Sequence, residues 1–297
     1  MTKNENENVN GDVDVDVDVD GDVNENAGRP ALTLVIGGRG KTGRRVVERL
    51  RDRGDAVRVG SRVGEPAFDW DDPAGWGAAL EGVDRVYVTF QPDLSVPGAP
   101  DLIGALASAA VAAGARRLVL LSGRGEESAE LCESRLKVPG AEWTVVRASW
   151  FDQNFDESFF LDSVRAGEIA LPVADAVEPF VDAGDIADVV VAALTDDRHV
   201  GRTYELSGPR LLSLADVADE LSKATGREIA YVPVSAEEYR AVLRENGLPE
   251  EFVELFTVIL DGRNAHLVDG VREVLGRAPK DFADYAREVA ATGVWDV

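Results

Sequence analysis

The sequence predicts an α/β protein built on a doubly wound parallel sheet, and three observations predict it. Short apolar runs rich in β-branched residues recur through the first half of the chain. Runs with helical periodicity separate them. Three glycines spaced three apart stand between the first apolar run and the first helical run. Strands that alternate with helices form a parallel sheet covered on both faces, and right-handed crossovers make it doubly wound.

The amino-terminal segment differs from the rest of the chain in composition. Nine acidic residues and one Lys give the first 28 residues a charge of −8, and Val alternates with Asp through much of the segment. The alternation has the period of a strand, but like charges on one face repel, so we expect a disordered acidic tail over residues 1–29. A calcium-loop pattern, D-x-D-x-D-G, starts at Asp16, but Ala27 stands where a bidentate Glu is required. We therefore expect no metal here.

The first strand and helix flank the three glycines. Residues 31–36 form a continuous apolar run, which is typical of a strand buried on both faces. Val46, Val47 and Leu50 then lie on one helical face, and Gly54 ends that helix. Further strands are expected at residues 56–61, 67–70, 84–90, 116–122 and 143–148, with a helix at 101–114. We assign residues 30–150 to a nucleotide-binding domain of the Rossmann type.

Beyond residue 151 the alternation loosens and helical patterns dominate. Residues 151–297 are therefore expected to complete the sheet and to form a smaller, helix-rich substrate cap. The expected helices cover residues 182–196, 213–226, 235–247, 249–260 and 281–293, and short strands are expected at 203–208 and 229–235.

Composition and charge exclude several classes of protein. The chain of 297 residues carries 31 basic and 55 acidic side chains, for a net charge of −24, and shows no cluster of Lys and Arg. Nucleic acid and anionic membrane surfaces are therefore not expected partners. The chain contains one cysteine, no apolar run of spanning length and no secretion signal. We expect a soluble, cytoplasmic monomer or homodimer.

The spacing of Gly37, Gly40 and Gly43 predicts a phosphate-binding turn. A strand precedes the glycines and a helix follows them, the context in which this pattern is informative. Gly37 permits the tight turn, Gly40 lets the backbone approach a pyrophosphate, and Gly43 lets helix and strand pack closely. A P-loop, the alternative, requires Gly at position 35, which is Val.

The end of the second strand indicates which nucleotide is bound. NAD binders place an acid there to hold the ribose 2′-hydroxyl, but Ser61 and Arg62 stand at this place. A guanidinium pairs well with a 2′-phosphate. Arg39 and Lys41 add positive charge inside the glycine turn. The sequence therefore favours NADPH over NADH.

Several sequence motifs, taken in order along the chain, resemble those of a known family. They are GGRGKTG at residues 37–43, SR at 61–62, FDW at 68–70, LLSGRGEE at 120–127, WTVVRASWFDQNF at 143–155 and YELSGP at 204–209. Together they resemble the NmrA-like branch of the atypical short-chain dehydrogenases/reductases, and their wording is most similar to the ergot-alkaloid subgroup of festuclavine and agroclavine dehydrogenases. The resemblance covers about residues 31–296.

The resemblance implies a set of residues that bind NADP(H) and a substrate pocket beside them. Around the pyrophosphate and the 2′-phosphate side, the implied residues are Gly37, Gly38, Arg39, Gly40, Lys41, Thr42 and Gly43. At the adenosine phosphate they are Ser61 and Arg62, and near adenine they are Asp69 and Trp70. At the nicotinamide ribose they are Thr89, Phe90 and Gln91, and at the nicotinamide they are Ser122, Gly123 and Ala148. The implied substrate pocket is formed by Trp150, Phe151 and Asn154.

One departure from ordinary short-chain dehydrogenases affects the chemistry. Those enzymes use a Tyr-x-x-x-Lys pair to supply a proton, but no Tyr stands between Ser122 and Trp143, and Lys137 is the only Lys there. The catalytic residues therefore stay unknown, and catalysis is expected to depend mostly on holding nicotinamide and substrate together.

Other chemically versatile residues lack partners at motif spacing. His199, expected in a surface loop, and His266 have no such partner, so structural roles are expected for both. Cys132 has no neighbouring His, and a buried, inert thiol is expected. No His pair or Cys cluster has the spacing of a zinc site.

The leading functional hypothesis is an NADPH-dependent reductase of a small, electron-poor aromatic or heterocyclic molecule. An iminium, a conjugated C=C bond or a quinone would fit. The apolar pocket that such an enzyme needs can come from Trp150, Phe151, Phe155, Phe159 and Phe160. A non-catalytic NADPH-binding redox sensor is one alternative, because the resemblance includes regulators. A non-redox isomerase or cyclase on the same scaffold is another.

Overall fold

The structure is a computed structural model, and it describes residues 1, 29–248, 250, 252–254, 256–257 and 260–297. The chain divides into two units, Met1–Pro30 and Ala31–Val297, and the second is described below. The expected acidic tail and its calcium-loop pattern lie almost wholly outside the described residues.

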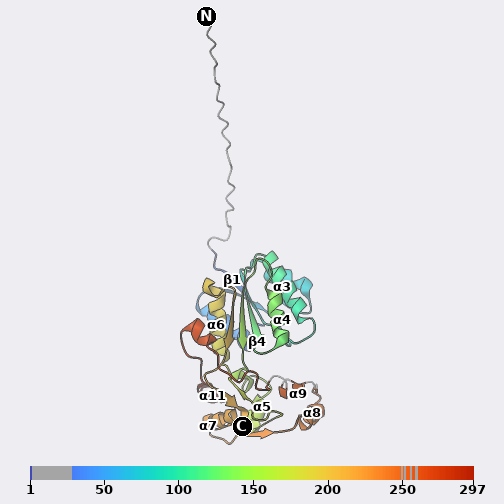
Figure 1. Cartoon of the computed structure of the whole chain (residues 1–297), viewed down its shortest axis with the longest axis vertical. Coiled ribbons are helices and arrows are strands. Elements are labelled where there is room, and N and C mark those ends of the chain that lie inside the picture. The colour runs from blue at the N-terminus through green and yellow to red at the C-terminus, as the bar shows by residue number, and fades with distance from the viewer. Residues whose placement is uncertain (2–28, 249, 251, 255, 258–259) are drawn as a thin grey trace. The chain divides into compact units, whose positions relative to one another are not determined.

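Six parallel strands form the central sheet in the order β2-β1-β3-β4-β5-β8 (Figure 1). The strands are β1 (Leu32–Ile36), β2 (Ala56–Gly60), β3 (Arg85–Val88), β4 (Arg117–Gly123), β5 (Glu142–Ala148) and β8 (Arg202–Leu206). β1 pairs with β2 on one side and with β3 on the other, so the strand order reverses at β1. Ligands of such sheets bind where the order reverses, beyond the carboxyl ends of the strands.

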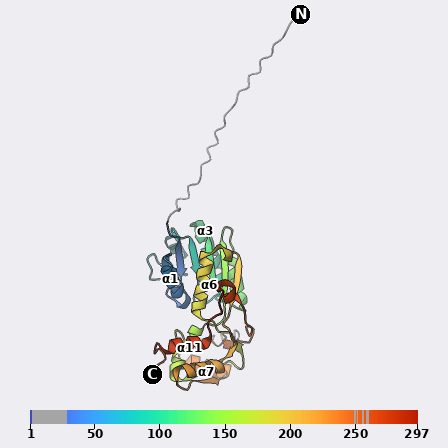
Figure 2. The same cartoon turned by 90° about the vertical axis from the view of Figure 1, so that its left-hand side faces the viewer.

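Helices cover both faces of this sheet, as the alternation predicts. α3 and α4 lie on one face and α6 on the other in Figure 1, and Figure 2 shows α1 beside α6. On the first face are α2 (Trp76–Leu80), α3 (Ala99–Ala112) and α4 (Glu127–Leu136), and on the second are α1 (Lys41–Asp52), α6 (Ala183–Thr195) and α10 (Gly270–Leu275). Each layer encloses its own apolar core against the sheet.

The cap, formed after residue 151, has a third core rich in aromatic side chains. Its helices are α5 (Leu161–Ala166), α7 (Leu214–Thr225), α8 (Ala236–Glu245), α9 (Phe252–Glu254) and α11 (Phe282–Ala290), and its short strands are β6 (Glu168–Leu171), β7 (Val177–Glu178), β9 (Leu212–Ser213) and β10 (Ala230–Pro233). Three turns of 3-10 helix complete the described elements: η1 (Pro73–Gly75), η2 (Asp152–Asn154) and η3 (Asp197–His199). Ser213 and Ser235 each begin a helix with a reciprocal capping box, which explains why sequence locates α7 and α8 well.

Two sequence predictions are wrong in detail. Residues 67–70 form no strand; Phe68, Trp70 and Trp76 instead pack together, at ring-centroid distances of 5.3 to 5.8 Å. His199 does not lie in an exposed loop but is buried, with Nδ1 2.9 Å from the Tyr204 hydroxyl. In the region 249–260, the described residues include α9 at Phe252–Glu254 and π-helix at 256–257, while residues 249, 251, 255, 258 and 259 lie outside the described part of the chain.

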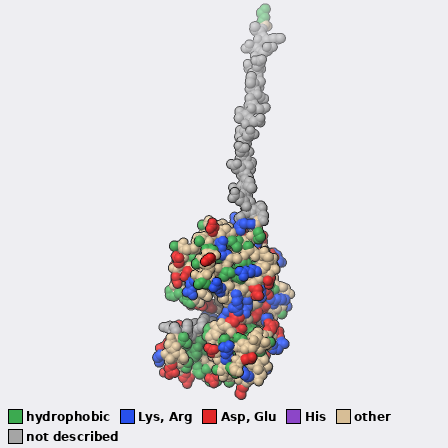
Figure 3. Space-filling view, turned by 180° about the vertical axis from the view of Figure 1, so that it is seen from behind, with side chains coloured by type: hydrophobic (Ala, Val, Ile, Leu, Met, Phe, Trp, Pro, Cys, Tyr) green, Lys and Arg blue, Asp and Glu red, His purple; other side chains and the backbone are tan. Residues whose placement is uncertain are grey.

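Charges of both signs are mixed on the surface. On the face shown in Figure 3, Lys and Arg side chains are interspersed with Asp and Glu side chains. The described residues of this face therefore form no continuous basic stripe. Among the described helices, none is both long and apolar enough to cross a bilayer.

Candidate functional site

The glycine turn between β1 and α1 is as tight as its spacing predicts. Gly37 has a φ of +65°, and a Cβ there would lie 2.4 Å from Thr89 Oγ1, at the end of β3. A Cβ at Gly43 would lie 2.2 Å from the Gly37 carbonyl oxygen. Because both spaces are too small for a side chain, helix and turn require glycine here.

The amino end of α1 is left available for an anion. Gly40 is its N-cap, with no capping side chain, and the first turn contains no acid. The first amides of a helix lack partners within the helix and attract negative charge. A phosphate placed at this turn would meet unsatisfied N–H groups.

A narrow cleft extends from the turn along the end of β2. Its lining residues are Ile36, Gly37, Gly60, Ser61, Arg62, Phe68, Trp70, Thr89 and Gln91. The Ser61 hydroxyl is buried and has no hydrogen-bond partner in the described structure. The exposed guanidinium of Arg62 likewise has no ion-pair partner among the described residues. An unpartnered hydroxyl beside a free guanidinium fits a phosphate group at this end.

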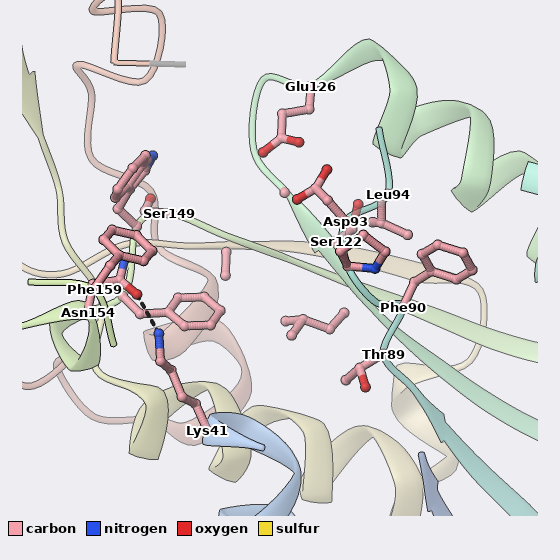
Figure 4. Close-up of a pocket in the computed structure, with 16 residues that line it drawn as sticks. Lys41, Thr89, Phe90, Asp93, Leu94, Ser122, Glu126, Ser149, Asn154 and Phe159 are labelled. Carbon is pink, nitrogen blue, oxygen red and sulfur yellow. Dashed lines mark hydrogen bonds between the residues drawn. The ribbon is translucent and has the colours of Figure 1, made fainter. Parts of the chain in front are cut away.

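A larger cavity of about 370 Å³ lies on the other side of Thr89 (Figure 4). Nine of the residues that the resemblance implies line it: Lys41, Thr89, Phe90, Ser122, Gly123, Ala148, Trp150, Phe151 and Asn154. The other lining residues are Pro92, Asp93, Leu94, Leu121, Glu126, Ser149 and Phe159. Of these, only Phe159 is expected from the sequence to line the pocket. The cavity thus lies at the carboxyl ends of β3, β4 and β5, where ligands of this fold class bind.

Lys41 reaches into this cavity rather than toward the cleft at Arg62. Its Nζ donates a 2.7 Å hydrogen bond to Asn154 Oδ1, drawn as a dashed line in Figure 4. Burial lowers the pKa of the Lys41 ammonium, against the opposing effects of Glu157 and Asp156. The first residue of α1 is therefore joined directly to η2, at the start of the cap.

The hydroxyl of Ser122 is held on the cavity floor by a buried ionic network. It donates a 2.7 Å hydrogen bond to Glu133 Oε1. Arg147 binds the same carboxylate through two hydrogen bonds of 2.8 and 2.7 Å. Since the Ser122 proton is directed at Glu133, this hydroxyl is not aimed at the cavity as a donor.

Two carboxyl groups that sequence analysis did not select lie at one rim of the cavity. Glu126 and Asp93 turn their carboxyl groups toward each other in Figure 4. Burial, reinforced by the negative charge of Asp93, raises the pKa of Glu126 to about 7, and Arg263 opposes this. A signal was present in the sequence, because Glu126 follows closely after Ser122 and Gly123 in the motif LLSGRGEE.

Four of the remaining predicted cofactor residues have structural partners or lie away from the cavity. Thr42 is buried and accepts a 3.0 Å hydrogen bond from the Tyr87 hydroxyl. Gly38 and the exposed Arg39 line a separate surface groove along α1. Asp69 accepts from Trp76 Nε1 with its carbonyl oxygen and lines neither the cleft nor the cavity.

Other candidate side chains have structural partners. His266 lies 2.9 Å from a guanidinium nitrogen of Arg124 through its Nε2. Cys132 is buried, as expected, and burial raises the pKa of its thiol to about 11. Lys137 places its Nζ 4.2 Å from the ring centroid of Trp143. Within the described residues, no group of His, Cys, Asp and Glu has the arrangement of a metal site.

Comparison with known proteins identifies the family. A model described as the NmrA-like family matches residues 67–285, more than half of the chain. This chain belongs to the NmrA-like family. The resemblance inferred from the motifs is thereby confirmed, including its similarity to the clavine dehydrogenases.

Proteins that are similar in sequence to this NmrA-like chain include enzymes and a protein whose name refers to differentiation. An NAD(P)H azoreductase from Xenophilus azovorans is 32% identical over 286 residues, covering 88% of this chain and 98% of that protein. Agroclavine dehydrogenase from Claviceps fusiformis is 31% identical over 280 residues, covering 86% and 96%. Prestalk A differentiation protein A from Dictyostelium discoideum is 29% identical over 276 residues, covering 86% and 91%.

Solved structures share the fold of this NmrA-like chain. An NADPH-dependent quinone oxidoreductase from Escherichia coli, complexed with NADPH, superposes with a TM-score of 0.73 at 19% identity, covering 87% of this chain and 99% of that one. NmrA, a negative transcriptional regulator, superposes with a TM-score of 0.64 at 18% identity, covering 91% and 100%. The predicted Rossmann-type α/β fold is confirmed.

Proposed function

We propose that this chain is an NADPH-dependent reductase that transfers hydride to a small, electron-poor organic molecule. One observation carries the proposal: the cleft at Ser61 and Arg62 and the cavity lined by aromatic residues meet at Thr89, beside the uncapped end of α1. A dinucleotide laid across the glycine turn would place its 2′-phosphate at Arg62 and its nicotinamide in the cavity. When bound, NADPH supplies the hydride.

The composition of the cavity supports an aromatic or heterocyclic substrate. Phe90, Trp150, Phe151 and Phe159 line it and offer flat apolar surfaces. Relatives named as an azoreductase and as clavine dehydrogenases support the same substrate class. We propose that iminium, quinone and conjugated double bonds are reduced here, without a Tyr and Lys pair. None of the five tyrosines of the chain lines the cavity.

A non-catalytic NADPH-binding regulator is the second candidate function. It is favoured by the relative named as a differentiation protein and by the fold shared with a transcriptional regulator. Both functions require the cleft at Arg62, but only a reductase requires hydride transfer in the cavity.

The test is oxidation of NADPH, followed at 340 nm, with a cyclic iminium, a quinone, an azo dye, an enone and a simple ketone. A reductase oxidises NADPH with at least one of the first four acceptors, with a lower KM for NADPH than for NADH. Tight NADPH binding without oxidation by any acceptor would replace the reductase with the regulator.

A further inference from the structure

The cavity is lined by an acidic group, and the proposed reduction of a neutral acceptor requires a proton. We propose that Glu126 donates the proton that completes the reduction of neutral acceptors such as quinones. This inference rests on the proposed reductase function and adds a catalytic residue to it. The sequence lacks the usual Tyr-x-x-x-Lys proton donor between Ser122 and Trp143 and predicts catalysis mostly by positioning.

The backbone around Glu126 directs its side chain into the cavity. Glu126 is the N-cap of α4, yet its carboxyl group makes no capping hydrogen bond to that helix. A Cβ at Gly123 would lie 2.2 Å from Glu126 Oε1 and 2.6 Å from its carboxyl carbon. The carboxyl group therefore occupies the space that a side chain at position 123 would fill. Since Gly123 ends β4 and lines the cavity, the Glu126 carboxyl group lies against the cavity at the end of this strand.

Burial and nearby charge favour the protonated form of Glu126 near neutral pH. Burial is the largest influence on its pKa, and the carboxylate of Asp93, from the loop that follows β3, raises it further to about 7. Asp93 is fixed in turn, because its Oδ1 accepts a 2.8 Å hydrogen bond from the amide of Ser95. Arg263, from the loop before α10, acts in the opposite direction. The neighbouring thiol of Cys132 is neutral, with a pKa of about 11.

Two other proton-bearing groups that line the cavity already donate hydrogen bonds. Ser122 donates to Glu133, and Lys41 donates to Asn154 on the side of the cavity opposite Asp93 in Figure 4. The Glu126 carboxyl group has no hydrogen-bond partner within the described residues. An acid without a partner in a largely apolar cavity is suited to a general acid.

Reduction of a quinone to a hydroquinone by hydride requires a proton as well. Hydride addition to a quinone leaves a negative charge on the quinone oxygen, and the O–H bond of Glu126 breaks as its proton bonds to that oxygen. The product is a hydroquinone, and the Glu126 carboxylate regains a proton from water. An iminium needs no such proton, because the arriving hydride neutralises the cation. Glu126 therefore serves one acceptor class and not the other.

The first experiment compares the two acceptor classes in the full chain. Glu126→Gln keeps the size and polarity of the side chain but removes its acidity. We expect kcat for quinone reduction to fall about 10²-fold more than kcat for iminium reduction, the range for loss of a general acid. The exposed neighbour provides a matched control, Glu127→Gln, which should leave both rates unchanged. An equal fall for both acceptors, or a selective fall in Lys41→Met instead, would overturn the proposal.

The second experiment does not depend on turnover. The carboxyl groups are titrated by infrared difference spectroscopy in wild type, Glu126→Gln and Asp93→Asn. We expect two carboxyls to titrate near pH 7, because burial also raises the pKa of Glu178 to about 7. One of the two signals should vanish in Glu126→Gln and titrate at lower pH in Asp93→Asn, because a negative neighbour has been removed. A Glu126 that titrates near its ordinary value would hold no proton at neutral pH and would overturn the proposal. Absence of NADPH oxidation in wild type, by contrast, would count only against the reductase.

Discussion

Lys41, the first residue of α1, donates a 2.7 Å hydrogen bond from Nζ to Asn154 Oδ1, in the 3-10 turn that opens the cap. This bond joins the glycine turn to the substrate side of the cavity. Because the ammonium is partly buried and its pKa is lowered, the bond is made where water competes little. The two halves of the site are thus coupled through one pair of side chains.

We expect this coupling to appear in a double-mutant cycle. Lys41→Met and Asn154→Ala should each lower the free energy of unfolding, and the double variant should lose less than the sum. A coupling energy of about 1–2 kcal/mol is expected for a hydrogen bond to a charged group. Urea unfolding of the four proteins measures it. Full additivity would show that the pair does not hold cap and turn together.

Cofactor preference is expected to depend on Arg62. Arg62→Ala should weaken NADPH binding by about 1.5–3 kcal/mol, because a charge-assisted bond to the 2′-phosphate is lost, and should leave NADH nearly unchanged. Titration calorimetry with both cofactors measures the difference. Arg272, exposed on α10, supplies a control in Arg272→Ala. Equal losses for both cofactors would place the 2′-phosphate elsewhere.

The close approach of helix and turn at Gly43 predicts a large effect on stability. In Gly43→Ala the new methyl group would meet the backbone at Gly37, 2.2 Å away, and backbone cannot yield as a flexible side chain can. We expect a loss of at least about 2 kcal/mol in unfolding free energy. Gly77, also helical, has nothing within 4 Å of its Cβ position. Gly77→Ala should therefore be neutral or add up to about 1 kcal/mol.

Buried Glu178 predicts a dependence of stability on pH. It is 3% exposed, its Oε1 has no partner, and burial raises its pKa to about 7. A raised pKa means that the folded chain binds the proton more tightly than the unfolded chain. The stabilisation is therefore complete below about pH 4.5 and is lost as pH rises through 7.

We expect Glu178→Gln to be more stable than wild type at pH 8 by about 2–3 kcal/mol and nearly equal to it at pH 4. The amide can still accept the hydrogen bond that Glu178 receives from the Trp150 backbone. Urea unfolding at both pH values is the measurement, and Glu237→Gln, on the exposed side of α8, is the control. The same difference at both pH values would show that folding does not raise the pKa of Glu178.

Local patterns were sufficient to predict the glycine turn. Gly37 and Gly43 lie within a few residues of one another, and strand, turn and helix follow directly in the sequence. Position in the cavity was predictable for residues at strand ends, such as Thr89 and Ala148, because parallel strands bring their carboxyl ends to one edge. The turn depends on residues that are close together in the sequence. The places of the strand ends depend on the rule that parallel strands end at the same edge of a sheet.

Features that depend on contacts between side chains of different elements could not be predicted in this way. Burial raises the pKa of Glu126, and the carboxylate of Asp93, from another loop, raises it further. His199 is buried because Tyr204 supplies a partner, and no local pattern shows this. The alternation of apolar and polar residues at 67–70 is typical of a strand. In the structure, the apolar side chains of Phe68 and Trp70 instead pack with Trp76.

The last prediction concerns Trp150, which lines the cavity and packs against Phe256 at a ring-centroid distance of 5.7 Å. Its backbone is fixed on both sides, since its carbonyl oxygen accepts a 2.8 Å hydrogen bond from Val181 and its amide donates to Glu178. The indole is thus held as a wall against which a flat substrate can lie. Removing the wall should loosen the approach of substrate to nicotinamide, and such misplacement can cost about 10²-fold in rate.

We therefore expect Trp150→Ala to lower kcat/KM for both iminium and quinone by about 10²-fold, while NADPH affinity changes little. Trp150→Phe should recover much of the rate, because a smaller aromatic wall remains. Ser122→Ala should cost less than 10²-fold, since the Ser122 proton is directed at Glu133. Steady-state kinetics with both acceptors tests all three variants. If Ser122→Ala abolishes turnover while Trp150→Ala does not, a polar contact rather than the aromatic wall positions the substrate.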